Sequence, residues 1–294
     1  ESAMKIARYA ILGTFIGMIL FGYALSQQVG DYRSAATGNW SNVSTWEMFD
    51  GANWVAASSA PTGTETITVD GEDSVSVDVV VTITGYVSVT DTGKVEVTTG
   101  SLTFGDGSTY EHARDEGSIP SSSWDMGSTL LMTGTETAAP TNRNQNYYNI
   151  TLNTPNLLSN RDLGLDDVII GGNIRVVNTG VSRWRLTSTS AGDTAIVTIM
   201  GDMIVESGSF ETQGTGNANT TFIVHQYGNI NVTGGNFSIA RGSQGSGLGT
   251  TTWYLHEGNF SMSDAATQNS NPTPGNAKFV FAKGDTQQIA FSNV

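Results

Sequence analysis

The stretch FIVHQYGNINVT, residues 222–233, decides the fold. Apolar and polar residues alternate on both sides of a Gly-Asn pair, which is typical of two short strands joined at a corner. Five such pairs mark the C-terminal half: Gly172-Asn173, Gly201-Asp202, Gly228-Asn229, Gly258-Asn259 and Gly284-Asp285. Successive pairs lie 29, 27, 30 and 26 residues apart. A regular step of this size indicates stacked repeats, because no single repeat can bury its apolar face alone.

The repeat predicts an all-β fold, a right-handed parallel β-helix (solenoid) with about 28 residues per coil. The connections are too short and too rich in β-forming residues for crossover helices. At each corner we expect glycine to supply a positive φ, and Asn or Asp to bond to neighbouring backbone. Stacked Asn and Asp side chains would then form a ladder along one turn. The ten corner residues are therefore expected to have a structural role.

The N-terminal segment indicates export. A short basic stretch, MKIAR at residues 4–8, precedes an apolar run at residues 9–25. Small residues at positions 24 and 26 favour cleavage before Gln27, so residues 1–26 are predicted to be a signal peptide. The alternative is a retained anchor helix, because the uncharged run is just long enough to span a bilayer. The expected location is the bacterial cell surface or the medium.

Two further regions follow from the sequence. Residues 27–62 are predicted to form a Trp-rich N-terminal cap, and residues 63–294 the β-helix, with an irregular insertion around 105–145. Trp40, Trp46 and Trp54 have two interpretations. They seal the first coil as a hydrophobic cap, which we favour, or they form an aromatic platform that contacts glycans.

Composition limits the classes of function. The 294 residues have a net charge of −14, and only 14% of them are charged. This balance argues against nucleic-acid binding, which requires clusters of Lys and Arg. The chain has no cysteine, so disulfides and thiolate metal sites do not arise.

Candidates for catalysis or metal binding are few. Three carboxylates lie beside Arg161 in the DLGLDD stretch (Asp162, Asp166 and Asp167), but a turn between strands explains them equally well. Calcium is the only cofactor that the sequence suggests, through residues 70–73 (DGED) and Asp106. His225 and His256 occupy near-equivalent places in successive repeats, so we expect them to lie close together. A surface ladder is favoured over a metal site there, because no third ligand is apparent.

The chain resembles a family of secreted β-helical surface proteins of the Bacteroidetes and Chlorobi lineages. The resemblance rests on the GN-[ILF]-x-V repeats at residues 172–176 and 228–232, the opening GNWSNVSTWEMFDGANWVAASSAPT and the closing KFVFAKGDTQQIAF. It implies type IX secretion and O-glycosylation of Asp-Ser/Thr-aliphatic triplets, here residues 73–75 and 193–195. The family's C-terminal sorting domain does not follow in this sequence, so we expect either a fragment of a longer protein or a solenoid with an open end.

Two functions remain in competition. The first is a non-catalytic structural or adhesive surface protein, a rod that assembles end to end or contacts other surface components; an open last coil would template such stacking. The alternative is a carbohydrate-binding or polysaccharide-cleaving β-helix module that uses its tryptophans. Cleavage requires carboxylates that converge on one face, and none is evident. We therefore expect no enzyme activity, and membrane contact only through an uncleaved N-terminal segment.

Overall fold

The computed structural model describes residues 27–187, 192–213, 220–239, 250–266 and 276–293. The predicted signal peptide or anchor, residues 1–26, lies outside this part. The described residues form an all-β fold with one short 3-10 helix, η1 (Val43–Thr45). Among these residues, no helix is both long enough and apolar enough to cross a membrane.

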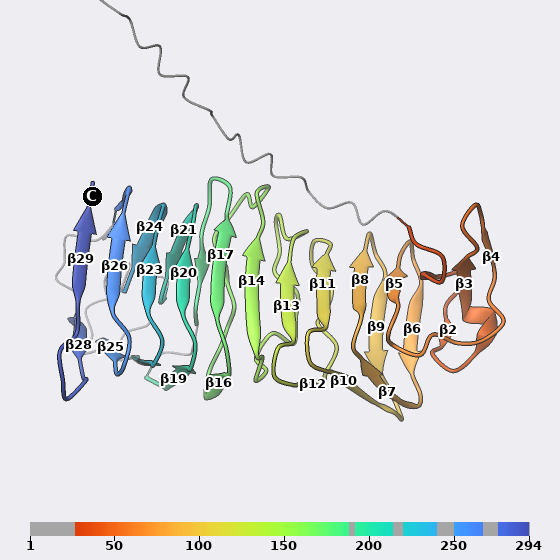
Figure 1. The fold of residues 1–294 in the computed structure, drawn as a ribbon, viewed down its shortest axis with the longest axis horizontal. Helices are drawn as coiled ribbons and strands as arrows, with labels where there is room; N and C mark the ends of the chain where they lie inside the picture. The colour runs from red at the N-terminus through yellow and green to blue at the C-terminus, as the bar shows by residue number, and fades with distance from the viewer. Residues whose placement is uncertain (1–26, 188–191, 214–219, 240–249, 267–275, 294) are drawn as a thin grey trace, which may run out of the picture.

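A 13-stranded sheet, here called the long sheet, runs the length of the molecule (Figure 1). Its neighbours are parallel from β29 to β1, and antiparallel from β1 through β3 to β4. In spatial order its strands are β29 (Ile289–Ser292), β26 (Phe260–Ser263), β23 (Ile230–Val232), β20 (Met203–Val205), β17 (Ile174–Asn178), β14 (Asn149–Asn153), β13 (Thr129–Met132), β11 (Thr109–Ala113), β8 (Tyr86–Thr90), β5 (Thr66–Val69), β1 (Tyr32–Ser34), β3 (Trp46–Phe49) and β4 (Trp54–Ala56).

Four smaller parallel sheets complete the stack. The C-terminal half contains β16 (Val168–Ile170), β19 (Thr194–Ile199), β22 (Thr221–Gln226), β25 (Thr250–Leu255) and β28 (Asn276–Phe281) in one sheet, and β15 (Arg161–Asp162), β18 (Trp184–Arg185), β21 (Ser209–Glu211), β24 (Gly235–Ser238) and β27 (Ala265–Ala266) in another. The N-terminal half contains β7 (Val80–Ile83), β10 (Ser101–Phe104) and β12 (Ser123–Trp124), and β2 (Gly38–Asn39), β6 (Ser74–Val77) and β9 (Lys94–Val97).

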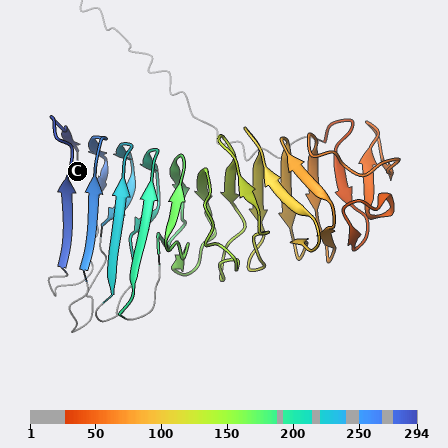
Figure 2. The same cartoon turned by 90° about the horizontal axis from the view of Figure 1, so that it is seen from below.

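The chain makes one coil each time it returns to the long sheet. In the C-terminal half a coil passes from the β16–β28 sheet to the long sheet and then to the β15–β27 sheet, for example β19, β20 and β21. Two views at right angles show the coils side by side along one axis (Figures 1 and 2). The result is an elongated stack of parallel strands with a solenoid-like path.

Coil length changes along the stack, which corrects the prediction of a uniform step near 28 residues. In the N-terminal half, Tyr86, Thr109, Thr129 and Asn149 lie in register on neighbouring strands, so those coils contain 20 to 23 residues. From Asn173 onward, equivalent residues are 27 to 30 apart. The Gly-Asn/Asp pairs mark only the longer coils, and the extra residues lie between the strands.

The predicted irregular insertion around 105–145 is also corrected. This segment contains β11, β12 and β13, and β11 and β13 pair in register with β8 and β14 on either side. Its turns are rich in Pro, Ser and charged residues, which hid the alternation of the short strands. The segment therefore belongs to the stack and is not an insertion, although its turns at 114–122 and 133–148 contain no strand.

Alternation along each strand builds the core. Inward positions are fully buried in nearly every coil, as Ile67, Leu130 and Trp184 illustrate, and outward positions carry mainly Thr, Ser, Asn or charged side chains. At its N-terminal end the long sheet finishes in the antiparallel strands β3 and β4. Trp46, the first residue of β3, packs edge to face against Trp40, with ring centroids 5.1 Å apart.

Candidate functional site

The corner residues form the ladder that the sequence predicts. Each Asn or Asp side-chain oxygen accepts the backbone N–H of the equivalent residue one coil later. The bonds are Asp202 N–H to Asn173 Oδ1 (2.7 Å), Asn229 N–H to Asp202 Oδ1 (2.7 Å) and Asn259 N–H to Asn229 Oδ1 (2.9 Å). The ladder begins one coil earlier than predicted, because Asn149 Oδ1 accepts the N–H of Asn173 at 2.9 Å. It is structural, since its bonds join coil to coil.

The glycines of these corners are required because a side chain would not fit. The expectation that they adopt a positive φ is wrong. None of Gly172, Gly201, Gly228 and Gly258 has a positive φ. A Cβ on Gly228 would lie 2.2 Å from the carbonyl oxygen of Gly201, and one on Gly258 only 2.0 Å from that of Gly228. The corners at Gly201, Gly228 and Gly258 thus lie against the backbone of the corner before them, whereas Gly172 lies against the side chains of Tyr148 and Asn149; in each case the contact leaves no room for a side chain.

The last predicted pair, Gly284-Asp285, does not belong to the ladder. The register pairs Phe260 with Ile289, so Gln288 takes the corner position and donates its N–H to Asn259 Oδ1 at 2.9 Å. A Cβ on Gly284 would meet no atom within 4 Å. The pair matches the motif in letters, but it lies in the turn before the corner.

A groove of about 290 Å³ lies on the outer face of the long sheet, beside the N-terminal edge. Its floor consists of outward side chains on β5, β8 and β11, and its wall of Arg33 on β1 and Trp54 on β4. The side chains that line it are mainly hydroxyl, carboxyl and aromatic, and they include Thr66, Thr68, Asp70, Tyr86, Ser88 and Glu111.

Hydrogen bonds and an ion pair fix the polar groups of this groove. Glu111 Oε2 accepts from the hydroxyls of Tyr86 and Ser88, both at 2.8 Å, and its Oε1 accepts from Thr133. The Arg33 guanidinium lies 4.7 Å from the centroid of the Trp54 ring and donates to Glu47 through Nε at 2.8 Å and Nη2 at 2.6 Å. These contacts hold the side chains of the floor and of the wall in place.

Electrostatics give the groove an acidic bias. Burial raises the pKa of Asp70, and the positive charge of Arg33 opposes this effect. The lining contains three carboxyl groups, on Asp31, Asp70 and Glu111, against the single guanidinium of Arg33. An anionic ligand is therefore disfavoured, whereas hydroxyl groups find both donors and acceptors.

The three predicted glycan-contact tryptophans separate in the structure. Trp40 and Trp46 are 2% and 1% exposed, and their indole N–H groups donate to the carbonyl oxygens of Pro61 and Trp40. Neither ring is available to a sugar, because both belong to the core. Only Trp54 is partly exposed, and it lines the groove. Sequence reasoning missed the groove's other side chains, because they come from strands far apart in the chain.

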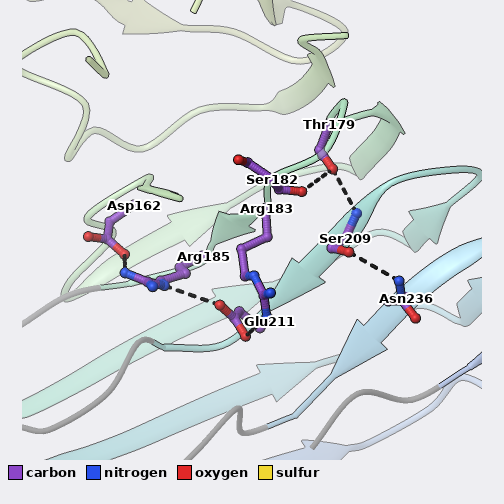
Figure 3. A network of polar contacts seen from close by, with 8 residues as sticks. All are labelled: Asp162, Thr179, Ser182, Arg183, Arg185, Ser209, Glu211 and Asn236. Atoms are coloured by element: carbon purple, nitrogen blue, oxygen red, sulfur yellow. Dashed lines mark hydrogen bonds and ion pairs between the residues drawn. The ribbon is translucent and has the colours of Figure 1, made fainter. Parts of the chain in front are cut away.

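An ion-pair network centred on the buried Glu211 occupies the β15–β27 sheet (Figure 3). Arg185 lies between Asp162 on the previous coil and Glu211 on the next, with contacts of 3.4 and 3.1 Å (Figure 3). Arg183 adds a second cation at 3.4 Å from Glu211, whose side chain is only 2% exposed. Burial raises the pKa of Asp162, and Arg185 acts against this shift. The charges alternate in sign from coil to coil, so the network ties three coils together.

The DLGLDD carboxylates therefore have structural surroundings. Asp162 is paired with Arg185, and the backbone of Asp166 bonds in both directions with the Asn144 side chain, at 2.9 and 3.0 Å. Asp167 has a φ of 52°, as expected of a turn residue. Asp70, proposed from sequence as a calcium ligand, bonds with Ser34 in the groove. Across the described ranges, no group of three or more His, Asp or Glu side chains is arranged to hold a metal ion.

The predicted proximity of two histidines is confirmed. His225 Nδ1 and His256 Nε2 are 2.9 Å apart, on the outer face of the β16–β28 sheet. Tyr254 stacks on His225 and Tyr227 on His256, each at an interplanar angle of 16°. Burial lowers the pKa of His225, and the neighbouring His256 lowers it further. The four side chains form a half-buried aromatic cluster that spans two coils.

The third histidine is inside the core. His112 is fully buried, with Nε2 2.7 Å from the carbonyl oxygen of Glu116 and Nδ1 3.3 Å from the Tyr110 hydroxyl. Burial lowers its pKa to about 4. The ring is therefore neutral near pH 7 and serves as a hydrogen-bonded part of the core.

The comparisons with known proteins identify no relative: no protein-family model, no curated protein and no solved structure matches this chain.

Proposed function

We propose that this protein is a non-catalytic, exported structural and adhesive protein of the bacterial cell surface. One observation carries the proposal. The coils are locked to one another along a single corner by the ladder from Asn149 to Gln288, outside a continuous buried core. Side-chain bonds that run along the stacking axis resist bending and local opening, as a rod that bears load requires.

The proposed architecture is a right-handed parallel β-helix. The parallel strands of the long sheet are joined by connections that pass through the other sheets. Connections of this kind are right-handed in nearly all proteins, because twisted strands pack back onto the sheet only in that sense. The handedness is therefore part of the proposal.

Export rests on the sequence of residues 1–26, with its basic and apolar sections. A composition rich in Thr, Ser and Asn with few charged residues is consistent with a secreted β-protein. The resemblance to secreted surface proteins points the same way. The proposed partners are other components of the cell surface, and no nucleic acid or cofactor is part of the proposal.

The test has two arms. Cells that produce the full chain are treated with an impermeant biotin reagent, and the purified protein is incubated with a panel of polysaccharides. We expect surface labelling of intact cells and no release of reducing ends or unsaturated products. Labelling only after lysis contradicts the proposed location, and turnover of any polysaccharide contradicts the non-catalytic role.

A second candidate function is carbohydrate binding, and the groove beside Trp54 favours it. Aromatic rings pack on the apolar faces of sugars, and carboxylates and hydroxyls bond to their hydroxyl groups. The groove provides Trp54 together with Glu111, Asp70, Ser88 and Tyr86. Because carboxylates outnumber cations there, we propose neutral glycans as the ligand class rather than uronates or sulfated sugars.

Glycan binding is tested with a fluorescent full-length chain on an array of neutral and acidic glycans. The Trp54→Ala and Glu111→Gln variants are expected to lose binding at least tenfold. Thr129→Ala serves as the control, because Thr129 faces outward on the same sheet but does not line the groove. Equal binding by all four proteins, or preference for acidic glycans, overturns this candidate.

A further inference from the structure

The floor of the groove beside Trp54 contains an ordered row of outward side chains that crosses four strands. Arg33 on β1 is the Cα partner of Thr68 on β5. The same register places Ser88 on β8 beside Thr68, and Glu111 on β11 beside Ser88. All four side chains line the groove. Because neighbouring strands are about 4.8 Å apart, the row is about 14 Å long, which suits a chain-like ligand.

The charges along this row differ in their partners. At one end, Arg33 donates two hydrogen bonds to Glu47, at 2.8 and 2.6 Å, so its positive charge is already paired. At the other end, the three hydrogen bonds of the Glu111 carboxylate all come from hydroxyl groups. Asp70, which directly follows β5, bonds with the hydroxyl of Ser34. Among the described residues, no ion pair involves Glu111 or Asp70, so the floor carries negative charge that no direct contact neutralises.

These two carboxylates stand at different places on the floor. Glu111 is on the second strand after β5 in the order of the long sheet, and Asp70 lies two residues beyond Thr68 along the chain. Their backbones are therefore about 10 Å apart across the strands and about 7 Å apart along them. A ligand that meets both carboxylates carries positive charge at two points along its length.

Trp54 adds an apolar surface at the Arg33 end of the row. The guanidinium of Arg33 lies over the indole, 4.7 Å from the ring centroid, and Phe49 packs against the ring at an angle of 54°. These contacts fix the orientation of the ring, which is partly exposed and lines the groove. Aromatic rings of this kind pack on the apolar faces of sugars. A lysine-rich peptide would meet the carboxylates, but its side chains offer no hydroxyl groups to Thr68 and Ser88.

We propose that the groove binds glycans built of amino sugars whose amino groups are free and protonated, with one ammonium group at Glu111 and another at Asp70. The inference rests on the carbohydrate-binding candidate above and narrows its ligand class. An ammonium group has three N–H donors, and hydrogen bonds between a cation and a carboxylate are roughly twice as strong as those between neutral groups. N-acetylation removes the positive charge. A deacetylated chain is therefore preferred over its acetylated counterpart.

The test compares two oligomers of equal length, one of glucosamine and one of N-acetylglucosamine, by calorimetry with the full chain. At about pH 6 and low salt, an amine of ordinary pKa is protonated and screening is weak. We expect the glucosamine oligomer to bind at least tenfold more tightly, and added salt to reduce the preference. Glu111→Gln and Asp70→Asn are each expected to reduce the preference at least threefold, whereas Trp54→Ala weakens the binding of both oligomers alike.

Asp91→Asn is the matched control. Asp91 is close enough for its charge to act on Asp70, but it does not line the groove. Its φ is 48°, which Asn also tolerates. This variant is expected to keep the preference within twofold of the wild type, and thermal unfolding checks that each variant is folded.

Equal or tighter binding of the acetylated oligomer overturns the inference and leaves the neutral-glycan candidate standing. Binding of neither oligomer also overturns the inference, because the glycan array tests neutral glycans independently. An equal loss of preference in Asp91→Asn and Glu111→Gln would assign the effect to net charge and not to contact. Binding of a lysine oligomer as tight as that of the glucosamine oligomer would assign the groove to basic peptides, which contradicts a sugar ligand.

Discussion

The side-chain oxygen of Asn229 accepts the backbone N–H of Asn259, one coil further along the stack, at 2.9 Å. Asn229 in turn donates its own N–H to Asp202 at 2.7 Å, so each corner is both supported by the previous coil and a support for the next. Coil-to-coil bonds of this kind explain why Asn and Asp recur with the repeat. Because each bond joins only two coils, a single substitution tests the contribution of one coil-to-coil junction to stability.

Removal of one ladder acceptor is expected to weaken one junction. Asn229→Ala leaves the N–H of Asn259 without its partner, and we expect a loss of about 1 kcal/mol in the free energy of unfolding. Asn259→Asp keeps an acceptor oxygen for Gln288, so its stability is expected to stay within a few tenths of a kcal/mol of the wild type. Urea unfolding followed by circular dichroism measures both. Equal midpoints for Asn229→Ala and the wild type contradict the role of the ladder.

Two glycines of the same motif are predicted to respond differently to alanine. Gly228→Ala places a methyl group 2.2 Å from the carbonyl oxygen of Gly201, so the backbone must move, at a cost of about 1–3 kcal/mol. Gly284→Ala meets no atom within 4 Å and its φ is not positive, so the variant is expected to be neutral or slightly more stable. Thermal unfolding of the pair distinguishes the two cases, and equal shifts would refute the close-contact explanation.

The buried and exposed ion pairs provide another matched comparison. Glu211→Gln removes the buried carboxylate that Arg183 and Arg185 share, while Arg185 keeps Asp162, and a loss of about 3 kcal/mol is expected. Glu206→Gln breaks an exposed pair with Arg175 and is expected to lose at most about 1 kcal/mol. Denaturant unfolding at low salt compares the two. A smaller effect for Glu211 than for Glu206 would contradict the proposed joining of coils by the network.

Stability is expected to fall in mild acid because of His112. Its pKa is 6.5 ordinarily and about 4 in the fold, so the unfolded chain binds the extra proton first as the pH falls. The contribution is complete above pH 6.5 and is lost between pH 6.5 and pH 4, by about 3 kcal/mol. His112→Gln removes the titrating group and should flatten the stability profile in this window. An unchanged slope would show that other groups cause the acid sensitivity.

The sequence predicts those contacts whose residues recur at the repeat step, and it does not predict contacts in coils that lack the Gly-Asn/Asp pair. The ladder and the proximity of His225 to His256 were predictable, because identical residues at one repeat step must lie on one corner or face. The shorter N-terminal coils were missed, since they contain no Gly-Asn pair to mark their steps. Asn149 escaped notice for a related reason: Tyr148 stands where later corners have glycine.

The candidate groove could not be predicted as a unit. Trp54 was singled out for its aromatic ring, but its neighbours Asp70, Tyr86 and Glu111 belong to three other coils or turns and are common surface residues. Only the register of the parallel strands brings them together. Conversely, Trp40 and Trp46 are aromatic residues of the same Trp-rich segment as Trp54, and their burial depends on how the chain packs at the N-terminal end of the long sheet.

Attachment of cells tests the central claim most directly. A strain that lacks the gene is complemented with the wild-type chain, Gly284→Ala or Gly228→Ala, and its attachment to a surface is measured at matched protein levels. We predict that the wild type and Gly284→Ala restore attachment, and that Gly228→Ala, whose stack is broken at one corner, does not. Equal attachment with and without the gene, or full restoration by Gly228→Ala despite a confirmed loss of stability, would contradict a structural and adhesive role for the stacked coils.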